Sequence, residues 1–80
     1  MKQSFETLME STGDLLHRVR KYDRDLMHSE EIKRLGETHA LIGQAIWVAD
    51  SDPLRERVME KLIRMKIRLM TLLENLLYTA

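Results

Sequence analysis

Apolar residues in the first third of the chain recur at alternating steps of three and four. The run is Phe5, Leu8, Thr12, Leu15, Val19, Tyr22 and Leu26, and Thr12 is its one polar member. This spacing is the a/d seam of an amphipathic helix. Ser4 stands just before the run, where its hydroxyl can accept a hydrogen bond from a free backbone N–H. The pattern therefore predicts a helix over residues 4–27.

The phase of the pattern changes after Leu26. A new seam follows at Ile32, Leu35, His39, Ile42, Ile46 and Ala49. Ser29 and the two glutamates after it can start a helix, since a hydroxyl caps free N–H groups and carboxylates favour the positive end of the dipole. We expect a second helix over 30–49, with a break or sharp bend near His28. One kinked helix spanning both seams is the alternative.

The segment Asp50-Ser51-Asp52-Pro53 marks the clearest boundary in the chain. Asp52 can cap a helix in which Pro53 takes the first position, where its missing N–H is not needed. A third helix is expected over 53–78. Its seam consists of Val58, Leu62, Met65, Leu69, Leu72 and Leu76.

A second apolar row lies beside that seam on the same helix. It consists of Met59, Ile63, Ile67, Met70, Leu73 and Leu77. A helix that is apolar on most of its circumference needs neighbours on more than one side. We therefore predict that this row binds a partner, and we add Trp47, which can anchor an interface or plug the end of the bundle.

Small residues form a row on the second predicted helix, at Gly36, Ala40 and Gly43. Glycine inside a helix costs stability, so a glycine kept there often allows two backbones to approach closely. The row predicts a close-packing face.

Length and composition limit the possible classes of protein. Eighty residues make one domain at most, with a marginal core. Thirteen basic residues balance thirteen acidic ones, so no overall field attracts nucleic acid or anionic lipid. The chain has no cysteine, which excludes disulfides and cysteine-based zinc sites. No signal peptide or membrane span is visible, and a cytoplasmic location is expected.

Motifs of catalysis are absent from the sequence. It holds no glycine-rich phosphate loop, no HExxH pair and no nucleophile elbow, and it has three glycines in all. We expect no enzymatic activity, no metal and no cofactor.

The histidines are the residues most able to suggest a metal site. Asp14 precedes His17 by three residues, as Asp25 precedes His28. The two pairs are eleven residues apart, or about 16 Å along a helix, so they reach one site only through antiparallel pairing of two chains. Solvated side chains are the favoured interpretation. His39 falls inside a seam, which predicts a core residue with one hydrogen-bond partner, or else a pH-sensitive interface residue.

Basic residues form a row on the third helix, at Arg57, Lys61, Arg64 and Arg68. A solvated or ion-paired face is one interpretation of this row. Binding of an acidic partner or a phosphate backbone is the other, although Glu56 and Glu60 interrupt the positive charge.

The sequence thus predicts an all-α fold, either a small bundle or a helical hairpin of three helices, completed by oligomerisation. The predicted function is that of a small interaction protein: an adaptor, a regulator or a chaperone-like partner. Its partner would be another protein or a second copy, a homodimer being the simplest case. The alternative is a nucleic-acid-associated regulator that uses the basic row.

Overall fold

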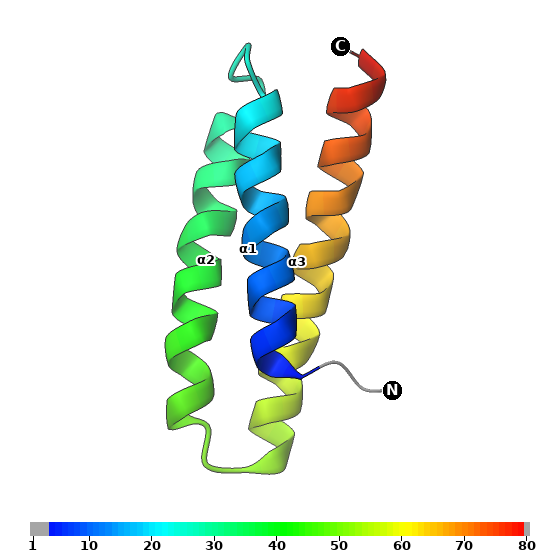
Figure 1. Cartoon of the computed structure of the whole chain (residues 1–80). Coiled ribbons are helices and arrows are strands. Elements are labelled where there is room, and N and C mark those ends of the chain that lie inside the picture. The colour runs from blue at the N-terminus through cyan, green and yellow to red at the C-terminus, as the bar shows by residue number, and fades with distance from the viewer. Residues whose placement is uncertain (1–3, 80) are drawn as a thin grey trace.

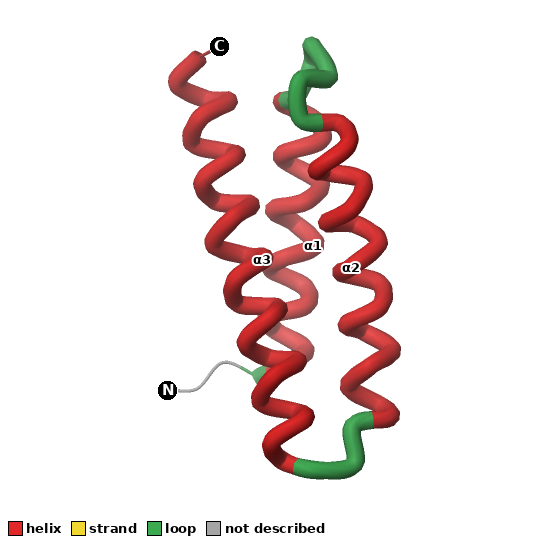
Figure 2. The backbone as a smooth tube through the Cα atoms, turned by 180° about the vertical axis from the view of Figure 1, so that it is seen from behind, coloured by secondary structure: helices red, strands yellow, loops and turns green. Residues whose placement is uncertain are grey.

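The computed structural model describes residues 4–79, which form three helices and no strand. They are α1 (Phe5–Tyr22), α2 (Ser29–Val48) and α3 (Asp52–Thr79). The chain runs up, down and up through them, so that successive helices are antiparallel (Figure 1). Figure 2 shows the short loops that join the helices at opposite ends of the bundle. The predicted all-α fold of three helices is confirmed.

One hydrophobic core holds the three helices together. Its buried members are Leu8, Leu16, Val19, Ile32, Ile42, Leu62, Met65, Leu69 and Leu72. Four of them belong to the predicted seam of α3, whose other two members, Val58 and Leu76, pack partly buried against the core. The third seam was therefore predicted correctly.

The seam predicted for α1 is partly wrong. Leu16 is buried where Leu15 was expected, while Tyr22 and Leu26 are exposed. The reason is geometric: a straight helix has 3.6 residues per turn, and its buried stripe drifts by about 20° per heptad from a strict 3.5 repeat. Val19 is buried as predicted, whereas Leu16 and Asp23 are buried one residue after the expected Leu15 and Tyr22, and Leu15 is only partly buried.

A six-residue loop, not a continuous helix, follows α1. The helix ends at Tyr22 instead of residue 27, and α2 begins at Ser29, so the kinked-helix alternative is wrong. The buried carboxylate of Asp23 accepts hydrogen bonds from the backbone N–H groups of Met27 and His28, each at 3.1 Å. Leu26 takes a positive φ of 56° within this turn. Asp23, rather than the predicted Ser29, thus satisfies the free donors that precede α2.

Serine hydroxyls cap the other two helices. Ser4 accepts from the N–H of Thr7 at 3.1 Å, which confirms the predicted cap of α1. Ser51 accepts from the N–H of Leu54 at 3.4 Å, so it takes the capping role that was predicted for Asp52.

The two glycines of α2 face α1. A Cβ atom added at Gly36 would lie 2.5 Å from Nη2 of Arg20, and one added at Gly43 would lie 3.1 Å from Cε of Met9. Both positions therefore serve the close approach of α1 side chains to α2. Ala40, the third member of the predicted row, is exposed.

Thr12 is a polar group sealed inside the core. Its side chain is fully buried, and Oγ1 has no hydrogen-bond partner among the described residues. We expect Thr12→Val to stabilise the protein by about 1 kcal/mol, because valine has nearly the same shape and leaves no polar atom to desolvate. Urea unfolding measures the change. Thr12→Ser, which keeps the hydroxyl and removes the methyl group, should be destabilising, and a valine variant no more stable than wild type would contradict the account.

Candidate functional site

The second apolar row of α3 stays largely open to solvent. We call Met59, Ile63, Ile67, Met70, Leu73 and Leu77 the α3 outer face. Ile63, Ile67, Met70 and Leu77 are 44%, 58%, 46% and 53% exposed, while Met59 and Leu73 are half-buried against the core. Helix α3, with 28 residues, is longer than α1 with 18 and α2 with 20. These two neighbours cover only part of the circumference of α3.

Four members of this face form the floor of a shallow groove beside α1. Leu8 from α1 lines it together with Met59, Ile63, Ile67 and Met70 from α3. The charged residues along it are Asp52, Arg55, Glu56, Glu60 and Lys66. An apolar strip with a charged rim is typical of surfaces that bind other proteins.

Trp47 lies outside this groove, near the end of α2. Its indole is 86% exposed, so it does not plug the bundle. It lines a separate hollow with Phe5 and Met9 of α1 and with Met59 of α3. Met59 thus connects the hollow to the α3 outer face, and the structure brings Trp47 to the edge of that face rather than onto it.

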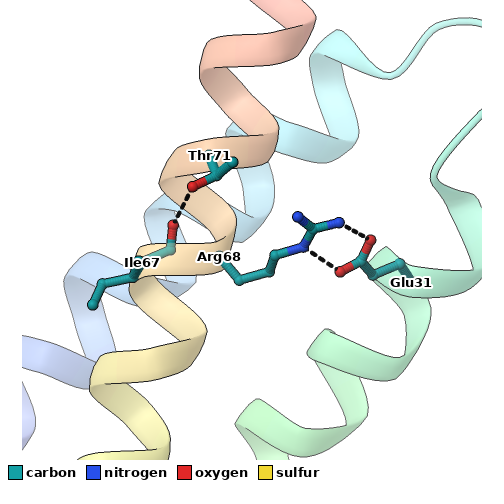
Figure 3. Close-up of polar contacts among 4 residues, drawn as sticks. All are labelled: Glu31, Ile67, Arg68 and Thr71. Carbon is teal, nitrogen blue, oxygen red and sulfur yellow. Dashed lines mark hydrogen bonds and ion pairs between the residues drawn. The ribbon is translucent and has the colours of Figure 1, made fainter.

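Arg68 is bound within the bundle rather than free. Its Nε donates to Oε2 of Glu31 at 2.6 Å and its Nη2 donates to Oε1 at 2.8 Å, which ties α3 to the first turn of α2 (Figure 3). The same view shows the Thr71 hydroxyl donating to the carbonyl of Ile67 at 3.1 Å. The hydrogen bonds and charge of Arg68 lower the pKa of Glu31, against a smaller opposing effect of desolvation.

The stability contributed by this ion pair should depend on pH. Because folding lowers the pKa of Glu31, the contribution is present above the unfolded value of 4.5 and is lost as the pH falls through the folded pKa. Solvent and salt screen the pair, whose side chains are 48% and 37% exposed, so we expect about 0.2–1 kcal/mol of coupling at neutral pH.

A double-mutant cycle of Glu31→Gln and Arg68→Gln measures that coupling at neutral pH and again at about pH 3, well below the usual pKa of a glutamate. The control is the Glu30–Arg34 pair, which is 3.9 Å apart and almost fully exposed, and which should show little coupling at either pH. A coupling energy for Glu31 and Arg68 that does not change with pH would contradict this assignment.

The other three members of the basic row lie along the groove between α2 and α3. Arg57, Lys61 and Arg64 are exposed and line that groove. The apolar residues beside them, Leu41, Val48 and Leu54, are also exposed and were missed as a candidate surface. A signal for it exists in the sequence, since Leu41, Ala45 and Val48 recur at steps of four and three next to the seam of α2.

The histidines do not come together. His17 lies exposed on α1, whereas Asp25 is in the loop, so Asp25 and His28 share no helical face. Within residues 4–78, for which side-chain positions are described, no group of three possible ligands is placed to hold a metal ion. His39 is half-buried, and its Nε2 lies 2.9 Å from the carbonyl of Met9, which gives it the single hydrogen-bond partner that was predicted.

No described helix combines the length and the apolar character that crossing a membrane requires. Comparison of the chain with protein-family models, with characterised proteins and with solved structures found no match. The function is therefore inferred from the exposed surfaces of the chain.

Proposed function

We propose that this chain is a small helical interaction protein, an adaptor, regulator or chaperone-like partner, that buries the α3 outer face against another protein surface. A second copy of the chain is the simplest such surface. The observation that carries the proposal is the row of four exposed apolar side chains, Ile63, Ile67, Met70 and Leu77, along one helix. The cytoplasm is the expected location, an expectation that rests on the cysteine-free composition.

The physical drive for such burial is the transfer of apolar surface out of water. Fully burying a side chain of this size gains about 1.5–3 kcal/mol relative to exposure, and each of the four is still about half exposed. A chain of 80 residues has little stability to spare, so association through this face would also stabilise the fold. Met59 and Met70 add flexible side chains that can adapt to more than one partner.

Binding of a hydrophobic fluorescent dye tests whether the α3 outer face is the exposed apolar surface through which the protein associates. If the wild type is a monomer, we expect the double variant Ile63→Ser/Ile67→Ser to bind less dye than the wild type. If the wild type is a dimer that buries this face, we expect the double variant to lose self-association. Met27→Ser is the matched control, because Met27 is exposed on the loop between α1 and α2, away from this face. Equal behaviour of the two variants would contradict the proposal.

A further inference from the structure

The groove between α2 and α3 is a second surface with its own chemistry. Its floor is aliphatic, formed by Leu41, Ala45 and Val48 of α2 and by Leu54 and Val58 of α3. Leu41 and Val48 are 63% and 79% exposed, so the helices leave this floor open. Figure 2 shows the bundle from the side on which α2 and α3 lie in front of α1. The α3 outer face, by contrast, is lined from α1 by Leu8.

Positive charge runs along the α3 edge of this groove. Arg57, Lys61 and Arg64 are exposed there, and none of them forms an ion pair within the part of the chain that the structure describes. The α2 edge is uncharged, and Glu60 is the one carboxylate among the described lining residues. The groove therefore joins an apolar floor to a rim of three cations and one anion.

The lining of the groove spans about three turns of α2. On α2 the lining runs from Thr38 to Val48, which is about 15 Å at 1.5 Å per residue. Ala49, in the loop into α3, lines one end of the groove, and the Glu31–Arg68 pair lies beyond the other end. About three turns of an α-helix have the same length.

We propose that this groove binds an acidic amphipathic helix of a partner protein, about three turns long. The apolar side of that helix covers Leu41 and Val48, and its carboxylates lie against the cations of α3, where opposite charge sets the orientation of the bound helix. A phosphate backbone would match the cations but would leave the aliphatic floor uncovered. No aromatic side chain is among the described lining residues, so bases have nothing to stack on.

Amide chemical shifts of the whole isotope-labelled protein test this site. The probe is a three-turn peptide with leucines at helical spacing and glutamates at the remaining positions. Two further probes are the same peptide with lysine in place of glutamate, and a short DNA duplex. We expect the glutamate peptide to shift the amides of Leu41, Ala45, Val48 and Lys61, and the lysine peptide and the duplex to leave them unchanged.

Substitutions then assign the contacts. Lys61→Glu/Arg64→Glu should weaken binding of the glutamate peptide about tenfold or more, and Leu41→Ser should weaken it as well. The matched control Arg18→Glu/Lys21→Glu reverses two exposed charges on α1 and should leave affinity unchanged. Ile63→Ser/Ile67→Ser should also leave it unchanged, so failure here is separate from failure of the α3 outer face.

Three results would overturn the proposal. One is no shift with the glutamate peptide. Another is equal binding of the lysine peptide. The third is tighter binding of the duplex through Lys61 and Arg64, which would assign the basic row to nucleic acid instead.

Discussion

Leu69→Ala is expected to lower the free energy of unfolding by about 2–5 kcal/mol, which is enough to unfold much of the population of an 80-residue chain. Leu69 is fully buried in the core. Removing its isobutyl group loses the transfer free energy of the buried atoms, and it leaves a cavity that the surrounding helices cannot close completely. Urea titration followed by circular dichroism measures the loss.

Ile67→Ala is the matched control for that experiment, two residues away on the same helix. Ile67 is 58% exposed, so its truncation should change the stability of the isolated chain by less than about 1 kcal/mol. The contrast separates the buried seam of α3 from its outer face. Equal losses in the two variants would mean that the outer face is packed, and the account of α3 would then be wrong.

Asp23→Ala should be the second most damaging change, at about 2–3 kcal/mol. The Asp23 carboxylate is buried and accepts from both Met27 and His28. Alanine would leave these two N–H groups without their acceptor at the positive end of the α2 dipole. Thermal and urea unfolding of the variant give the measurement.

Asp25→Ala is the control within the same loop, since Asp25 is exposed and should tolerate the change. Asp23→Asn should fall between wild type and Asp23→Ala, because an amide offers one acceptor oxygen where the carboxylate offers two. Equal stability of the alanine variants at positions 23 and 25 would contradict the role given to Asp23.

The buried seam of α3 could be predicted because its periodicity is strong. Leu62, Met65, Leu69 and Leu72 lie where their spacing put them. The prediction failed at the end of α1, because Tyr22 and Leu26 continue the apolar spacing past the last turn of the helix and into the loop. Spacing describes which residues would share a face, and it does not show where a helix ends. Here the end depends on the buried carboxylate of Asp23, a residue type that often begins turns.

The candidate surfaces were predictable to different extents. The α3 outer face could be predicted because α3 carries two apolar rows, more than its neighbours can cover. The structure leaves Ile63 and Ile67 of the second row exposed, as expected. The partner of Arg68 could not be predicted, because Glu31 is 37 residues away in the chain and the two meet only once α2 and α3 are packed. The spacing of Leu41, Ala45 and Val48 signals the α2 side of the second groove, but its α3 side, with Leu54 and Arg57, joins it only once the two helices are packed.

The most direct test of the α3 outer face is the molar mass of the wild-type protein in solution, measured by light scattering over a range of micromolar concentrations. We expect the mass of the wild type to rise above the 9.5 kDa of one chain with concentration, and that of Ile63→Ser/Ile67→Ser to stay at 9.5 kDa. A wild-type chain that is stably folded, remains at 9.5 kDa throughout and takes up no hydrophobic dye would contradict this expectation.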